Sequence, residues 1–98
     1  MKYSIKYLPS FSRELHKIAL ALEKYPAKAK RLLKEVDEKL RLLEDTPFMC
    51  EVYHPRPKYR RMVLEDHFLF YAVCEEEMIV CVHHILYSKM DIEQRLRD

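Results

Sequence analysis

The segment at positions 80–91, VCVHHILYSKMD, holds the side chains best suited to proton transfer. Two adjacent histidines, His83 and His84, are followed by Tyr87 and Lys89. Histidine titrates close to neutral pH, so it can take or give a proton under physiological conditions. The pair could therefore take part in acid–base chemistry, hold a metal ion or simply pack in the fold.

Cations gather in a second segment, HPRPKYRR, at positions 54–61. The candidate RNA-binding residues in it are Arg56, Lys58, Arg60 and Arg61. Tyr53 and Tyr59 are interleaved with them, and cations beside aromatic rings suit a phosphate backbone with stackable bases. A solvated loop that leads into an edge strand has the same composition. The sequence leaves both interpretations open.

The two histidines are predicted to lie on one strand, at positions 78–87. Neighbouring residues of a strand point to opposite faces of the sheet, so His83 and His84 should have separate surroundings. We expect one to be hydrogen-bonded against the helices and the other to face the open side. On this argument they cannot hold one metal ion, and no metal is expected. Simple packing in the strand is the competing interpretation for each of them.

Two helices are predicted in the first half of the chain, after a short strand at positions 2–8. Ser10 is expected to cap the first helix, whose apolar residues recur at helical spacing as far as Leu22. Pro26 suits the first position of the second helix, whose apolar stripe continues to Leu43. The connection between them is short, so the helices should form an antiparallel hairpin.

Three further strands are predicted in the second half, at positions 59–65, 67–74 and 78–87. Their connections are short, which favours an antiparallel meander. Asp91 is expected to cap a short C-terminal helix, IEQRLRD. The predicted fold class is therefore α+β: an N-terminal strand beside the last strand, a helix hairpin on one sheet face, and the meander.

Composition limits the remaining possibilities. The 98 residues, half of them apolar, suit a single domain over 1–98, and the net charge of +2 does not by itself indicate nucleic-acid binding. Three cysteines without a CxxC pair indicate reduced thiols, and the absence of glycine excludes a glycine-rich phosphate loop. There is no signal-peptide core and no long apolar run, so we expect a cytoplasmic protein that does not bind membranes.

The order of elements, taken with two segments, resembles the RelE/ParE superfamily of toxins from type II toxin–antitoxin systems. The resemblance covers nearly the whole chain and is strongest in YRRMVLEDHFLFYAV, 59–73, and VHHILYSKMDIEQRL, 82–96. A Tyr-Arg opening, an acidic turn, an aromatic-rich strand and an I-x-Tyr/His-x-x-x-Asp close recur in that superfamily. It implies a compact toxin that is neutralised by an antitoxin, which wraps it with a helix or an extended segment.

The resemblance implies two different targets. RelE-like members cut mRNA in the ribosomal A site without a cofactor, using lysine and arginine for phosphate and a tyrosine or histidine near the last strand. ParE-like members lack that set and inhibit DNA gyrase. This chain departs from the cleaving members at Phe68 and Met90, where they commonly carry cations. Ribosome-dependent mRNA cleavage, gyrase inhibition without catalysis, and a non-toxic binding domain therefore remain the three hypotheses.

The resemblance to the cleaving members also implies roles for the candidate residues. Cleavage of RNA without a metal needs a base for the 2′-hydroxyl proton, an acid for the leaving oxygen and a cation for the phosphate. His83 or His84 could be the base, Tyr87 or Lys89 the acid, and Arg60 or Arg61 the cation.

Overall fold

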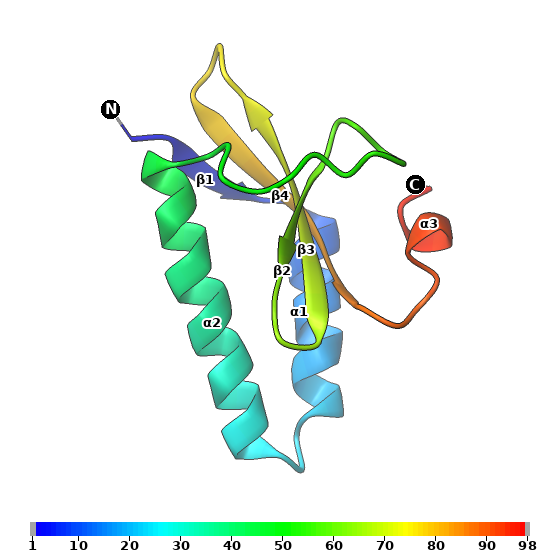
Figure 1. Ribbon diagram of the computed structural model, residues 1–98. Coiled ribbons are helices and arrows are strands. Elements are labelled where there is room, and N and C mark those ends of the chain that lie inside the picture. Colours follow the sequence, from blue (N-terminus) through cyan, green and yellow to red (C-terminus); the bar gives the residue numbers. More distant parts are fainter. Residues whose placement is uncertain (1, 98) are drawn as a thin grey trace.

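The structure is a computed structural model that describes residues 2–97, and its elements follow the predicted order (Figure 1). They are β1 (Ser4–Tyr7), α1 (Pro9–Ala21), α2 (Pro26–Asp45), β2 (Arg60–Val63), β3 (His67–Cys74), β4 (Ile79–Tyr87) and α3 (Ile92–Arg95). Pro9 and Pro26 are the first residues of the two long helices. Proline fits this position because its missing N–H would have no partner within the helix.

The four strands form one sheet in the order β1-β4-β3-β2. The three later strands make the predicted antiparallel meander. β1 lies at the edge, parallel to β4, with Ser4 opposite Ile79 and Tyr7 opposite Val82. The helix hairpin α1–α2 connects β1 to the rest of the chain and covers one face of the sheet (Figure 1). The predicted α+β architecture is confirmed.

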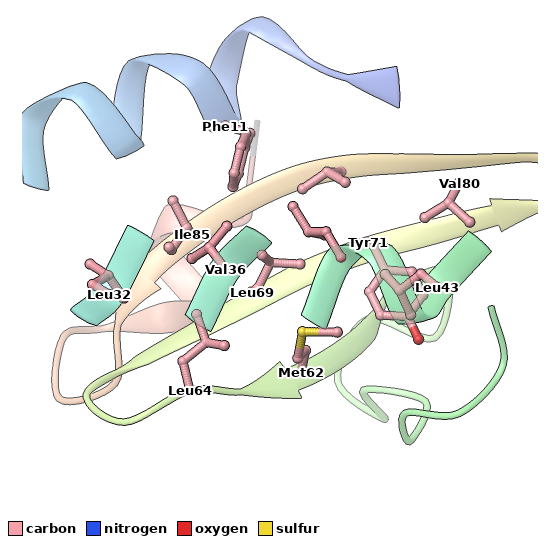
Figure 2. Packing of buried hydrophobic residues seen from close by; sticks show 12 residues of the cluster. Phe11, Leu32, Val36, Leu43, Met62, Leu64, Leu69, Tyr71, Val80 and Ile85 are labelled. Atoms are coloured by element: carbon pink, nitrogen blue, oxygen red, sulfur yellow. The ribbon is translucent and has the colours of Figure 1, made fainter. Parts of the chain in front are cut away.

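The main core fills the space between the sheet and the helix hairpin (Figure 2). Its sheet side comes from alternate positions, Leu69 and Tyr71 on β3 and Val80 and Val82 on β4, as expected for strands with one face on a core. The helix side comes from the apolar stripes and contains Phe11, Leu32, Val36, Leu40 and Leu43. The Tyr71 hydroxyl donates to the Pro47 carbonyl at 2.9 Å, and burial raises the pKa of this phenol.

A second, smaller apolar cluster covers part of the other sheet face. Its buried members are Tyr59, Phe70, Leu86 and Leu96. Tyr53 and Phe68 pack against them from the loop before β2 and from β3, and Met90 and Ile92 do so from the C-terminal segment. This face is thus lined by aromatic side chains and is not an open polar surface.

Two predicted details of the helix ends have different outcomes. Ser10 does not cap α1, because the helix already begins at Pro9 and its N-cap residue is Leu8, without a side-chain hydrogen bond. The Ser10 hydroxyl instead donates to the His83 carbonyl at 2.6 Å. Asp91 does cap α3, since its carboxylate accepts from the Gln94 N–H at 3.3 Å. α3 ends at Arg95 and is shorter than predicted; Asp98 lies outside the described residues.

The turn between β3 and β4 contains a backbone conformation that favours glycine. Met78 has φ = 55° there, although the chain has no glycine. A Cβ atom is unfavourable in this region, so Met78→Gly should have a free energy of unfolding about 1 kcal/mol higher than Met78→Ala. Both variants remove the side chain beyond Cβ, so urea denaturation of the pair measures the backbone effect alone. Equal stability of the two variants would contradict this account.

Candidate active site

The β3–β4 pairing changes register at the histidine pair. Phe70 pairs with His84, but the next residue of β3, Tyr71, pairs with Val82, so that His83 is an extra residue in β4. Such a β-bulge interrupts the alternation of side chains along a strand. The prediction that the two histidines occupy opposite faces was therefore wrong, because it assumed a regular strand.

Both histidine rings lie against the same aromatic side chain. The Tyr59 ring centroid is 5.0 Å from that of His83 and 6.1 Å from that of His84, and both contacts are edge-on. Tyr59 is only 1% exposed and His84 only 5%, whereas His83 is half-buried. Within residues 2–97, no group of three or more His, Cys, Asp and Glu side chains is arranged to hold a metal ion. That no metal takes part stays a prediction, but its original argument from opposite faces does not hold.

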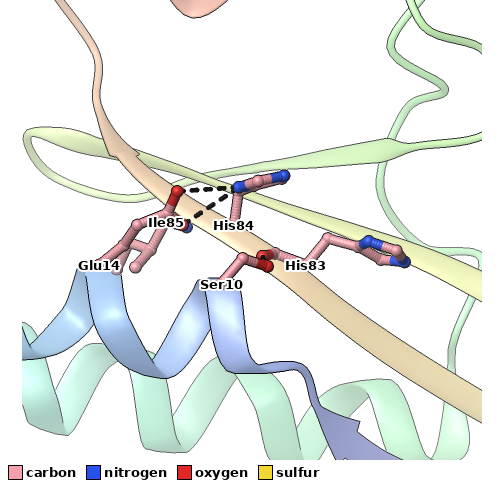
Figure 3. A network of polar contacts seen from close by, with 5 residues as sticks. All are labelled: Ser10, Glu14, His83, His84 and Ile85. Carbon is pink, nitrogen blue, oxygen red and sulfur yellow. Dashed lines mark hydrogen bonds and ion pairs between the residues drawn. The ribbon is translucent and has the colours of Figure 1, made fainter. Parts of the chain in front are cut away.

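Helix α1 holds this part of β4 in place (Figure 3). β1 ends at Tyr7, opposite Val82, and leaves the following edge of β4 without a neighbouring strand. On that edge the Glu14 side chain supplies the acceptor in place of a strand. Its carboxylate accepts from the Ile85 N–H at 3.1 Å and from His84 Nδ1 at 2.9 Å. Together with Ser10 on the His83 carbonyl, this fixes the backbone on both sides of the bulge. The Glu14 carboxylate also fixes the orientation of the His84 imidazole ring.

The surroundings of His83 favour its neutral form. Burial lowers the pKa of the His83 imidazole below its usual value of 6.5, and nearby His84 and Lys58 lower it further. A positive charge on this ring would be poorly hydrated and close to another cation. At neutral pH His83 is therefore an uncharged imidazole with a free nitrogen lone pair, as a general base requires.

The predicted cations fall into two groups. The Lys58 ammonium lies 4.9 Å from the centre of the Tyr59 ring, and the Arg61 guanidinium lies 4.8 Å from that of Phe68 and 5.6 Å from that of Tyr53. These two cations border the aromatic face that carries the histidines. Arg60 and Arg56 form the second group.

Arg60 has a structural position apart from the histidines. Its guanidinium donates to the Cys50 carbonyl at 2.6 Å and to the Phe48 carbonyl at 3.3 Å, and it lies over the Phe48 ring at 5.0 Å. It therefore holds the loop that precedes β2. Arg56 lies half-buried in the same loop, where its backbone N–H donates to the Tyr53 carbonyl at 2.9 Å.

The two predicted proton donors do not share the surroundings of the histidine pair. Tyr87 is at the end of β4, opposite His67, and its ring centroid is 5.9 Å from that of His67. It follows Leu86, which belongs to the aromatic face, so alternation directs Tyr87 to the helix side. Lys89 is exposed in the turn after β4. The structure thus brings together His83, His84 and Lys58, and leaves Tyr87 apart.

Two residues of the site were not singled out as site residues in the sequence. Tyr59 was noted only as an aromatic neighbour of the basic segment, but it is the ring on which both histidines pack. Glu14 reads as one polar residue of an amphipathic helix. It does lie three residues after Phe11 and four before Ile18, both of which pack in the core. A carboxylate on the buried side of a helix is a signal that could have identified it.

The fold is shared with solved structures from toxin–antitoxin systems. The structure resembles E. coli toxin RelE, solved in the free state as a mutant with two arginines replaced by alanine, with a TM-score of 0.72 and 15% identity over 97% of this chain and 93% of that one. It also resembles a chain of the toxin–antitoxin complex RelBE2 from Mycobacterium tuberculosis, with a TM-score of 0.61 and 13% identity over 89% of this chain and 99% of that one. Comparison with curated proteins gave no significant sequence match.

The family follows from the sequence itself. Residues 5–92 match the family described as the ParE toxin of the type II toxin–antitoxin system parDE. The chain therefore belongs to the ParE toxin family of type II toxin–antitoxin systems. Among the helices of residues 2–97, none is both long and apolar enough to cross a membrane.

Proposed function

We propose that this toxin cleaves RNA without a metal, at the aromatic face that carries His83. The observation that carries the proposal is the placement of a half-buried His83 beside His84, Tyr59 and the cation Lys58, in surroundings that lower its pKa. Structural packing alone does not require a cation next to a histidine in surroundings that disfavour its protonation. A site that must accept a proton close to a phosphate does require both groups.

In the proposed reaction, His83 takes the proton from a ribose 2′-hydroxyl. The 2′-oxygen then forms a bond to the adjacent phosphorus while the bond from phosphorus to the 5′-oxygen breaks. The products are a 2′,3′-cyclic phosphate and a 5′-hydroxyl, so no water or cofactor is consumed. His84 is the proposed donor of the proton to the leaving 5′-oxygen. Its Nδ1–H stays on Glu14, so the transferred proton would come from Nε2, and the His83 and His84 ring centroids are 6.3 Å apart. After the reaction, His83 would return its proton to solvent and His84 would regain one.

The cations and the aromatic residues would bind the substrate. Lys58 and Arg61 are proposed to neutralise the negative charge of the RNA phosphates. This matters most at the scissile phosphate, where negative charge increases as the reaction proceeds. Tyr53 and Phe68 are partly accessible and lie beside the Arg61 guanidinium, so RNA bases could stack on these rings or on that cation, without strong sequence preference. Lys89 and Arg56 remain proposed contacts to the RNA at the edge of this face.

Inhibition of DNA gyrase is the second candidate, and the family match favours it. It is also supported by Phe68 and Met90, which pack in the apolar cluster at positions where RNA-cleaving toxins commonly carry cations. On this hypothesis the aromatic face is a protein-binding surface and His83 has no role in proton transfer.

An antitoxin is the proposed partner under either hypothesis. One structural neighbour was solved as a toxin–antitoxin complex, and family members are named for such a system. The basic segment at positions 54–61 would favour an antitoxin segment that carries carboxylates beside apolar anchors.

One experiment separates the two targets. The toxin is induced without antitoxin, and cellular mRNA is examined by primer extension while supercoiling by purified gyrase is measured with increasing toxin. The RNA proposal predicts cuts at fixed positions within codons, which require translation, and unchanged supercoiling. Growth arrest with intact transcripts and lost supercoiling would replace it with the gyrase hypothesis. Unchanged growth would favour a non-toxic binding domain.

A further inference from the structure

A cavity of about 300 Å³ lies beside the candidate active site, between α1, the end of β4 and the C-terminal segment. Its rim carries three cations, Arg13 and Lys17 from α1 and Arg95 from α3. Within residues 2–97 none of these three makes an ion pair with an acidic side chain, in contrast to most cations of α2. Three unpaired positive charges around one concave surface attract an anion.

The one carboxylate that lines the cavity, Glu14, does not cancel this charge. It is already bound to His84 Nδ1 and to the Ile85 N–H. The floor is apolar, with Ile18, Leu86 and Met90 among its residues. The cationic rim suits the phosphate of a nucleotide, and the apolar floor suits its base or ribose. A rim of carboxylates would instead repel the phosphate. The volume is also at the lower end of the range of small-ligand pockets.

We propose that this cavity binds one nucleotide of the RNA, next to the nucleotides at the cleaved bond. The inference rests on the proposed RNA cleavage. Glu14 is the physical link, because the same side chain lines the cavity and orients His84. Arg13 and Arg95 can each bind a phosphate through two parallel hydrogen bonds, and Lys17 adds a further positive charge. An RNA strand held at the aromatic face and in this cavity would be fixed on two sides of His84.

The test compares two double variants of the full-length protein. Arg13→Ala with Lys17→Ala removes two cations from the cavity, and the matched control, Lys24→Ala with Lys30→Ala, removes two exposed cations that do not line it. The probe is a short fluorescent RNA methylated at every 2′-hydroxyl, which cannot undergo the proposed reaction. Its binding is measured by anisotropy over a series of salt concentrations, after thermal unfolding has shown that both variants are folded.

The cavity variant should bind the RNA about tenfold more weakly at low salt, and its salt dependence should decrease by about one released ion. The control should stay within about twofold of the parent protein. Equal binding by the two variants would overturn the inference and leave the proposed RNA cleavage intact. If the cavity variant bound RNA like the control but bound a purified antitoxin more weakly, the cavity would be assigned to an acidic protein segment. That result would also overturn the inference. If the parent protein neither binds nor cuts RNA, both proposals fall together.

Discussion

Glu14→Ala should lower the free energy of unfolding by about 2–4 kcal/mol, because it leaves two polar groups without a partner. The Ile85 N–H and the 5%-exposed His84 both depend on this carboxylate, and β1 does not extend far enough along this edge of β4 to replace it. For a domain of this size, the loss corresponds to a decrease in Tm of about 10–20 °C. Calorimetry and urea denaturation of the purified toxin would measure it.

Two further variants make the Glu14 result interpretable. Glu14→Gln keeps an oxygen that can accept from the Ile85 N–H but removes the charge, so it should lose less stability than Glu14→Ala. Glu38→Ala removes a carboxylate from an exposed ion pair with Lys34 and should change the free energy of unfolding by less than about 0.5 kcal/mol. If Glu14→Ala were as stable as Glu38→Ala, α1 would not anchor the edge of β4 as described here.

His83→Asn should lower the rate of RNA cleavage by about 10²–10⁴-fold, the usual contribution of a positioned general base. Its effect on RNA binding should be small, because the phosphate contacts are assigned to Lys58 and Arg61. The control is His54→Asn, an exposed histidine of the basic segment, which should cleave at the parent rate. Cleavage by His83→Asn at the parent rate would exclude His83 as the base.

The pH dependence of the parent protein tests the same assignment independently. The pKa of His83 is lowered from 6.5, so the neutral, active form increases as the pH rises through that lowered value. The cleavage rate should therefore rise as the pH increases in the region below 6.5, and this rising limb of the profile should end by neutral pH. This rising limb should be missing in His83→Asn. Single-turnover rates measured between acidic and neutral pH would show whether it is.

The fold could be predicted from sequence because its elements are encoded locally. Pro9 and Pro26 mark the helix starts, and the apolar stripe from Leu32 to Leu43 gives the buried side of α2. β3 was predicted with the bounds it has, His67–Cys74, because its aromatic run is limited by acidic turns. Each of these signals acts over a few residues, so no distant contact was needed to interpret it.

The site could be predicted only in part because its geometry depends on contacts between distant segments. The bulge at His83 is stabilised by Ser10 and Glu14, which are about seventy residues away in the sequence. Alternation along β4 carries no information about such contacts and gave the wrong face for one histidine. The same holds for Arg60, whose neighbours in sequence suggest phosphate binding but whose guanidinium is bound to backbone carbonyls of the preceding loop.

The parallel pairing of β1 with β4 affects when this toxin can become active during its synthesis. Ser4 pairs with Ile79 and Tyr7 with Val82, so the first strand has no partner until residues 79–82 have been made. The same delay applies to Glu14 and His84, which meet only when β4 reaches α1. Contacts between such distant segments form late, because loop closure costs entropy before the contacts return it. A nascent chain without β4 would therefore lack both the completed sheet and the bound orientation of His84, so the candidate site would assemble only after β4 has been made.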